Sequence, residues 1–218
     1  MISNGIEFLL KGGWVMWPMF LLATVSLTVI IERGISINRA AIDTEALLAK
    51  LKSLLGAEQT DEALRLCENT PGPVAALLAN GLRNSHLDNA SIERAMEELA
   101  LREAPELHKR LSILDTIITL APLLGLLGTI TGMIGAFQAA FAPGTSNAAP
   151  TAITGGVAEA LIATATGLVI AIVTLPFYNY LSERVQEIIA DMETRATQLL
   201  NILARQRDAQ ERGVPVLK

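Results

Sequence analysis

Three apolar stretches, each long enough to cross a bilayer, constrain this chain of 218 residues more than any other feature. They are residues 14–31, 113–141 and 156–181. The hydrocarbon core of a bilayer is crossed by about 20 helical residues. Irregular backbone cannot face lipid, because its polar groups would find no hydrogen-bond partners there. The sequence therefore predicts an all-α membrane protein with three transmembrane helices.

The composition supports a membrane protein and excludes several other classes. The chain is 51% hydrophobic and only 18% charged, whereas soluble domains have about 25% charged residues. A net charge of −5 gives no reason to expect a nucleic-acid partner. The single cysteine, Cys67, excludes an internal disulfide and a multi-cysteine metal site. Without a phosphate loop, metal-ligand spacing or nucleophile motif, we expect no enzyme activity and no cofactor or metal.

The positions of Lys and Arg predict the orientation, since cytoplasmic loops are enriched in both. Lys and Arg are frequent between Arg33 and Arg110, absent from Leu111 to Ser182, and resume at Arg184. The first apolar stretch is too long for a cleaved signal segment, so we read it as a membrane helix. The predicted division is a periplasmic N-terminus (1–13), span one (14–31), a cytoplasmic helical domain (32–112), span two (113–141), a periplasmic link (142–155), span three (156–181) and a cytoplasmic extension with its tail (182–218).

Helical periodicity extends beyond the spans on the cytoplasmic side. Ser91 is predicted to cap a helix that continues into span two, with a break at Ala104–Pro105 as the alternative. Span three is predicted to continue as one amphipathic helix from about Gly156 to Arg205.

Small residues recur every three or four positions in spans two and three. The stripe in span two comprises Gly125, Gly128, Gly132 and Gly135, and the stripe in span three comprises Gly156, Ala160, Ala163 and Gly167. Close backbone contact drives helix association in lipid, so both stripes predict tight helix packing. The pattern leaves open whether the partner helix belongs to the same chain or to another subunit.

Polar side chains in the same spans are candidates for an ion pathway. They are Thr129, Glu159, Thr164 and Thr166. Glu159 and Thr166 are seven residues apart and share a face, whereas Thr164 lies about 140° from Glu159 around the helix. A carboxylate within a span indicates a pathway by default. The alternatives are an interfacial Glu159 with its carboxylate in water, and threonines that bond to their own helix.

Three segments together resemble the ExbB/TolQ branch of the MotA/TolQ/ExbB proton-channel family. They are "GGWVMWPMFLLATVSLTVIIER", "PLLGLLGTITGM" and "AEALIATATGLVIAI". The resemblance covers nearly the whole chain and includes the three-span topology with an outer N-terminus. It implies that Thr129, Glu159 and Thr164 occupy the family's pore positions. Thr131 stands where relatives often carry a larger or apolar residue.

The resemblance implies a homopentamer of this chain around a dimer of an ExbD- or TolR-like single-span protein. The assembly would lie in the bacterial inner membrane, in contact with its lipids. That partner would supply the aspartate that titrates. The expected function is ExbB-like: use of proton flow to energise a TonB-like protein for outer-membrane uptake. The alternative is a TolQ-like role in envelope maintenance, acting on a TolA-like protein. A gliding or flagellar stator is the third and least favoured choice. The sequence does not distinguish protons from sodium.

Two rivals of other classes give different expectations. A structural membrane scaffold would use the glycine stripes alone and would tolerate loss of the threonine hydroxyls. A secondary transporter would show repeated halves and a mid-membrane substrate site, and neither is visible in three spans.

Overall fold

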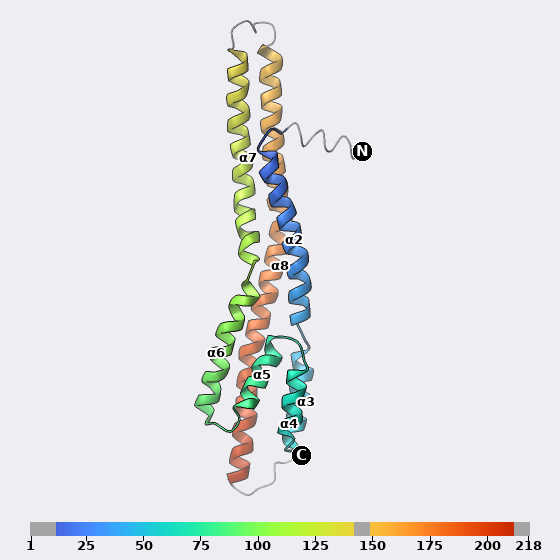
Figure 1. The fold of residues 1–218 in the computed structure, drawn as a ribbon, viewed down its shortest axis with the longest axis vertical. Helices are drawn as coiled ribbons and strands as arrows, with labels where there is room; N and C mark the ends of the chain where they lie inside the picture. Colours follow the sequence, from blue (N-terminus) through green and yellow to red (C-terminus); the bar gives the residue numbers. More distant parts are fainter. Residues whose placement is uncertain (1–11, 142–148, 212–218) are drawn as a thin grey trace. The chain divides into compact units, whose positions relative to one another are not determined.

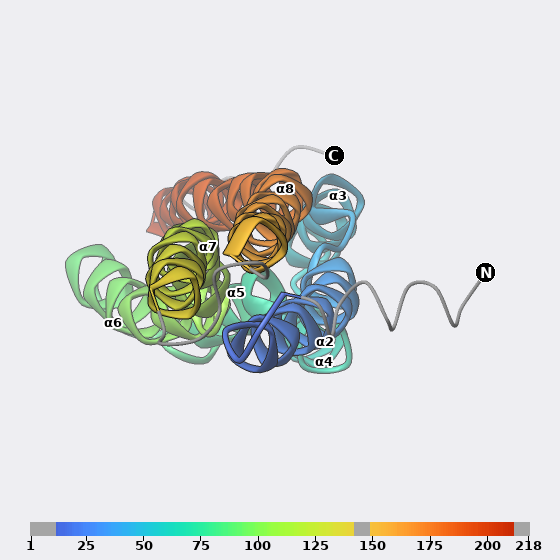
Figure 2. The same cartoon turned by 90° about the horizontal axis from the view of Figure 1, so that it is seen from above.

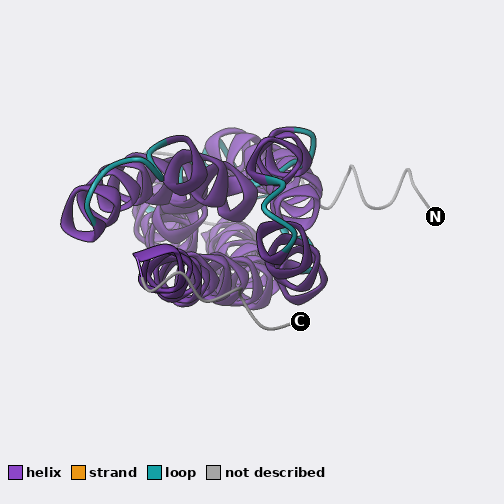
Figure 3. Cartoon of the chain, turned by 90° about the horizontal axis from the view of Figure 1, so that it is seen from below, coloured by secondary structure: helices purple, strands orange, loops and turns teal. Residues whose placement is uncertain are grey.

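The computed structural model describes residues 12–141 and 149–211, and every regular element among them is a helix (Figure 1, Figure 3). The helices are α2 Met16–Ala40, α3 Thr44–Gly56, α4 Thr60–Glu68, α5 Pro73–Arg83, α6 Asn89–His108, α7 Leu111–Ala140 and α8 Ala149–Glu211. The chain divides into two compact units. We call Met1–Arg33 with Arg110–Tyr180 the span unit, and Gly34–Lys109 with Leu181–Lys218 the loop unit.

Three apolar helical segments of the described chain are long enough to cross a membrane. In chain order, the most apolar windows of the three segments have mean hydropathies of 1.7, 2.0 and 2.2. Many of their large apolar side chains are exposed, as expected of surfaces that lipid covers; Trp17 and Phe20 of α2, for example, are 72% and 64% exposed. The prediction of an all-α chain with three membrane-spanning helices is confirmed for the described residues.

Glycines bring α7 and α8 of the span unit into backbone contact (Figure 2). A Cβ atom on Gly132 would lie 2.9 Å from the carbonyl oxygen of Gly156, and one on Gly125 would lie 3.0 Å from the Cα atom of Thr164. These distances leave no room for a side chain at either position. Lipid tails are as apolar as leucine, so helices in a bilayer associate through such close packing.

The two small-residue stripes face each other along this contact. Its members are Gly125, Gly128 and Gly132 on α7 and Gly156, Ala160, Ala163 and Gly167 on α8. Gly135 differs, because no described atom lies within 4 Å of the place that its Cβ would take. Packing within one chain therefore accounts for the contacts of these residues but not for Gly135.

Helix α2 packs along α8 through residues that are seven apart on each helix. Met19 contacts Gly167, and seven residues further along each helix the hydroxyls of Ser26 and Thr174 form a hydrogen bond of 2.8 Å. These two residues are only 3% and 2% exposed. Because Thr174 donates its proton to the carbonyl of Ile170, Ser26 is the donor to Thr174. Seven-residue steps keep contacts on one side of two helices that coil gently around each other.

The helix that was predicted to continue into span two is interrupted at Arg110. Helix α6 ends at His108 and α7 begins at Leu111, while Arg110 has a φ of 67°, in the left-handed region that terminates helices. The Arg110 guanidinium forms an ion pair with Glu32 of α2. The predicted continuous helix is therefore wrong, and so is the alternative break, because Pro105 lies inside α6.

Two helix starts also differ from the prediction. Asp88, not Ser91, caps α6: its carboxylate accepts the Ser91 N–H at 3.2 Å, and hydrogen bonding from Ser91 holds the pKa of Asp88 below its ordinary value. Helix α8 begins at Ala149, within the link predicted at 142–155. Pro150 suits a first helical turn, where its missing N–H would have no partner in any case.

In the loop unit, α3, α4, α5 and α6 pack with one another and with the second half of α8. The apolar core includes Leu51, Leu55, Leu77, Leu78, Ile92, Met96, Met192 and Leu199, all at most 2% exposed. On α8, Arg195 donates to the Thr44 hydroxyl, and Arg207 donates to the Ser85 carbonyl at 2.7 Å. The amphipathic extension of span three therefore supplies one side of this core.

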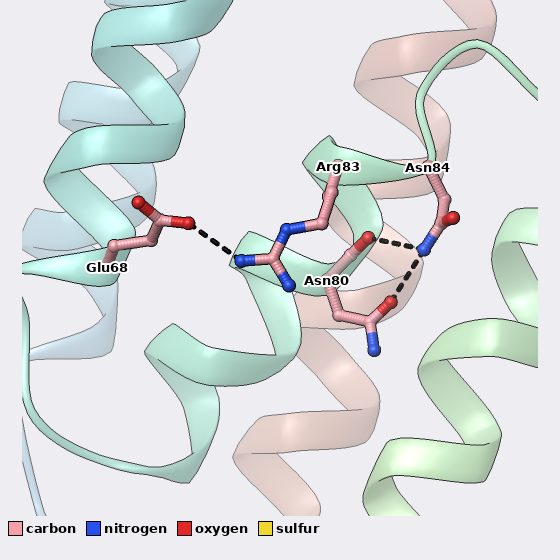
Figure 4. A network of polar contacts seen from close by, with 4 residues as sticks. All are labelled: Glu68, Asn80, Arg83 and Asn84. Atoms are coloured by element: carbon pink, nitrogen blue, oxygen red, sulfur yellow. Dashed lines mark hydrogen bonds and ion pairs between the residues drawn. The ribbon is translucent and has the colours of Figure 1, made fainter.

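An ion pair at the surface of the loop unit connects α4 with α5, and a side-chain amide bonds back to α5 at the end of that helix. Figure 4 shows Arg83 reaching Glu68 at 2.7 Å, while the Asn84 amide nitrogen donates to the carbonyl and the side-chain oxygen of Asn80. The ion pair is exposed, and pairs of this kind contribute little to stability. The fold of the unit therefore depends mainly on its apolar core.

We expect Gly128→Ala to destabilise the span unit by about 1–3 kcal/mol, because the added methyl overlaps Ala163 in a contact limited by backbone. Gly135→Ala is the matched control. The added methyl meets no atom of the described residues within 4 Å, so this change should be neutral or stabilising by up to about 1 kcal/mol. Thermal unfolding in detergent, followed by the fluorescence of Trp14 and Trp17, measures both changes. Equal losses for the two variants would contradict the contact.

Cys67 should resist alkylation while the protein is folded. It is 1% exposed, and burial, followed by the charge of Glu68, raises the pKa of its thiol to about 11. At pH 8 only about one thiol in a thousand is then the reactive thiolate. Labelling with iodoacetamide between pH 7 and 9 should be slow for the native chain and fast in denaturant. Rapid labelling of native protein would show that this part of the core opens readily.

Candidate functional site

The polar site of the span unit begins with a hydrogen bond between its two facing helices. The hydroxyl of Thr164 on α8 donates to the carbonyl of Gly125 on α7 at 3.1 Å. The missing side chain at Gly125 permits this approach. Thr164 is half-buried, so its oxygen lies at the edge of the helix contact rather than in its centre.

Thr129 lies one helical turn beyond Gly125 on α7, and residues four apart are neighbours on a helix surface. Its hydroxyl donates to the carbonyl of Leu126 at 2.6 Å, and the residue is half-buried. Helical geometry places Thr129 and Thr164 on the same side of the α7–α8 pair. Each hydroxyl oxygen retains acceptor capacity, because each donates its own proton to a carbonyl. We call this pair of residues the threonine edge.

Glu159 lies on the other side of α8, against the start of α2. Its carboxylate occupies the place where a Cβ atom on Gly13 would be. The α2 side also holds a small apolar cluster of Val15, Met16 and Met19, against which Ile170 of α8 packs. The structure therefore separates Glu159 from the threonine edge by the width of the small-residue contact.

Thr166 follows the face of Glu159, as the sequence spacing predicts, and its hydroxyl donates to the carbonyl of Ile162 at 2.8 Å. Bonding to the carbonyl four residues earlier is common in these spans: Thr116, Thr119, Thr131, Thr166 and Thr174 all do so. The hydroxyls of Thr129 and Thr166 thus bond within their own helices, whereas the hydroxyl of Thr164 reaches the neighbouring helix α7.

Two residues that matter here were missed by the sequence analysis. Ser26 holds α2 to Thr174 of α8, and Gly13 accommodates the Glu159 carboxylate. The signal for Ser26 was present, since Met19 and Ser26 on one helix match Gly167 and Thr174 on the other at the same seven-residue step. The described residues contain no group of three or more His, Cys, Asp or Glu side chains that could hold a metal.

A family profile and individual known proteins match this chain, and they point to the same family. The sequence profile of the MotA/TolQ/ExbB proton channel family matches residues 69–194, which include Thr129, Glu159 and Thr164. The chain is 35% identical over 182 residues to the putative biopolymer transport protein ExbB-like 1 of Synechocystis sp., covering 81% of this chain and 70% of that protein. It is 40% identical over 113 residues to the Tol-Pal system protein TolQ of Haemophilus influenzae, covering 52% and 49%.

A second Synechocystis sp. protein, the putative biopolymer transport protein ExbB-like 3, is 31% identical over 170 residues, with 78% of this chain and 81% of that protein covered. The segment matched by the family profile contains α7, the membrane-spanning part of α8, the small-residue contact and the threonine edge. From the profile match and from these relatives, the chain belongs to the MotA/TolQ/ExbB proton channel family.

Proposed function

We propose that the chain is the multi-pass subunit of an inner-membrane motor that is driven by the proton-motive force. In its ExbB-like form the motor works with an ExbD-like partner and energises a TonB-like protein for uptake across the outer membrane. Family membership supports a proton-channel role, and several relatives carry the name biopolymer transport protein ExbB.

The observation that carries the proposal is the threonine edge, on the side of the α7–α8 pair opposite α2. Thr164 bridges to Gly125, and Thr129 lies one turn further along α7. Hydroxyls donate and accept, so they can solvate a carboxyl group in both its neutral and its charged form. A proton that moves down 100 mV releases about 2.3 kcal/mol, which a partner's carboxyl could harvest by alternating between these forms.

The proposed assembly is a homopentamer around a dimer of the single-span partner, with the threonine edge of each copy lining the central pore. Residues 1–13 and 142–155 face the periplasm, and residues 32–112 and 182–218 face the cytoplasm, as the Lys and Arg positions favour. Glu159 and Thr166 belong to the same proton pathway but act from the α2 side of α8. Gly135, whose Cβ position has no neighbour within 4 Å among the described residues, is available for contact with the next copy.

A TolQ-like role in envelope maintenance, through a TolA-like protein, is the second candidate. The observation that favours this role is the identity of 40% to the Haemophilus influenzae TolQ protein, measured over a matched segment of 113 residues. The two roles share the motor and differ in what it drives, so the site residues do not separate them. A structural membrane scaffold is the rival function of another class. It is favoured by the span threonines whose hydroxyls bond to their own helix, such as Thr116, Thr119 and Thr166.

We expect Thr164→Val to reduce energy-dependent uptake strongly while the complex still assembles. A hydrogen bond to a charged group contributes about 1.5–3 kcal/mol, so activity should fall roughly tenfold or more. Thr119→Val is the matched control, because Thr119 is exposed and bonds only to the Asp115 carbonyl in the described chain. Uptake by cells that carry each variant, with its partner present, is the measurement. Full activity of Thr164→Val in an assembled complex would favour the scaffold.

The purified complex should have the mass of five copies of this 23.3 kDa chain plus two copies of a small single-span protein. Native mass spectrometry after release from detergent measures the mass and identifies the partner. A chain that purifies as a monomer from mild detergent, without a partner, would contradict the proposed motor.

A further inference from the structure

Gly13 combines a backbone conformation that favours glycine with a place in the turn that starts α2. Its φ is +75°, in the left-handed region that side chains disfavour. Its carbonyl accepts the N–H of Met16 at 3.2 Å, so this residue forms the turn from which α2 starts. Both features are local to the backbone, and alone they would describe an ordinary helix start.

The second observation comes from α8, on a segment far away in the sequence. A Cβ atom on Gly13 would overlap the Oε1 atom of Glu159 and lie 2.9 Å from Cδ and 3.4 Å from Cγ. The neighbouring Gly12 faces other groups: a Cβ there would meet the Cγ and Sδ atoms of the flexible Met16 side chain and lie 3.2 Å from Ile162. The contact with Glu159 is therefore specific to Gly13.

The chemistry of this contact favours a fixed carboxylate. The first N–H groups of a helix lack partners within the helix, and the helix dipole places partial positive charge at that end. Glu159 is half-buried, so few water molecules compete for its oxygens. The start of α2 thus offers the carboxylate a favourable position, and the absence of a side chain at Gly13 leaves that position open.

We propose that Gly13 is a positioning residue for Glu159. By leaving room for the carboxylate against the first turn of α2, it fixes the glutamate's side-chain conformation and couples the glutamate to span one. This inference rests on the proposed function, in which Glu159 belongs to the proton pathway. It adds span one to that pathway as the support of its glutamate, whereas α7 supports the threonine edge.

The test is a double-mutant cycle of Gly13→Ala with Glu159→Asp. Aspartate is one methylene shorter and withdraws the carboxylate from the new Cβ atom. The backbone strain of Gly13→Ala is present in both backgrounds and cancels in the cycle, so any coupling reports the contact with Glu159. Gly12→Ala and Gly34→Ala are controls; the first lies next door without touching Glu159, and the second meets nothing within 4 Å.

We expect Gly13→Ala to lower proton-driven uptake roughly tenfold, and the two control variants to change it less than about twofold. Glu159→Asp should lower uptake in the wild-type background and raise it in the Gly13→Ala background. Such rescue would not occur if Gly13 were only a turn residue. If the effects of the two changes simply multiply, the proposal is overturned.

A stability readout separates this inference from the proposed function. The melting temperatures of the four purified complexes should be non-additive, with Glu159→Asp recovering part of the loss caused by Gly13→Ala. Additive shifts overturn the inference, whatever uptake shows. If the Gly13→Ala variant does not accumulate in the membrane, its amount there is compared with that of the double variant. A higher amount of the double variant supports the inference, and an equally low amount overturns the inference. A wild-type complex without proton-driven uptake would instead refute the proposed function and leave the melting cycle valid.

Discussion

The backbone contact between α7 and α8 is the constraint on which the rest of the span unit depends. Two apolar helices in lipid gain little from hiding apolar surface, so their association requires close approach along a surface without side chains. Glycine and alanine provide that surface over several turns, from Gly125 to Gly132 on one helix and from Gly156 to Gly167 on the other. This fixed contact also sets the sides of the pair on which the polar residues lie.

Helix α2 makes the two sides of that pair different. Along one side, α2 and the turn before it contact α8. The contacts pair Gly13 with Glu159, Met19 with Gly167, and Ser26 with Thr174. The opposite side carries Thr129 and Thr164 and is left uncovered by α2. One side of α8 is thus occupied by the chain itself, and the other is free for the partner that we propose.

Much of this arrangement could be predicted from the sequence. Length and hydropathy predicted the three spans, and helical geometry correctly put Glu159 and Thr164 on different faces of one helix. What could not be predicted depends on partners that are distant in the sequence. The hydrogen bond of Ser26 requires the register of α2 on α8, and the break at Arg110 accompanies an ion pair with Glu32. The helix-breaking tendency of proline had instead suggested a break at Pro105, but this residue lies inside α6.

The small-residue contact also has an electrical consequence. Between Glu159 and Thr164 on α8 lies the small-residue contact, whose buried members Ala160 and Ala163 carry only methyl groups and therefore no side chain that could pass on a proton. The carboxylate and the hydroxyl on α8 are therefore insulated from each other around the circumference of that helix. In the assembly that we propose, a proton path that used both would have to cross between them through groups of neighbouring molecules, so conduction would be a property of the assembly rather than of a single copy.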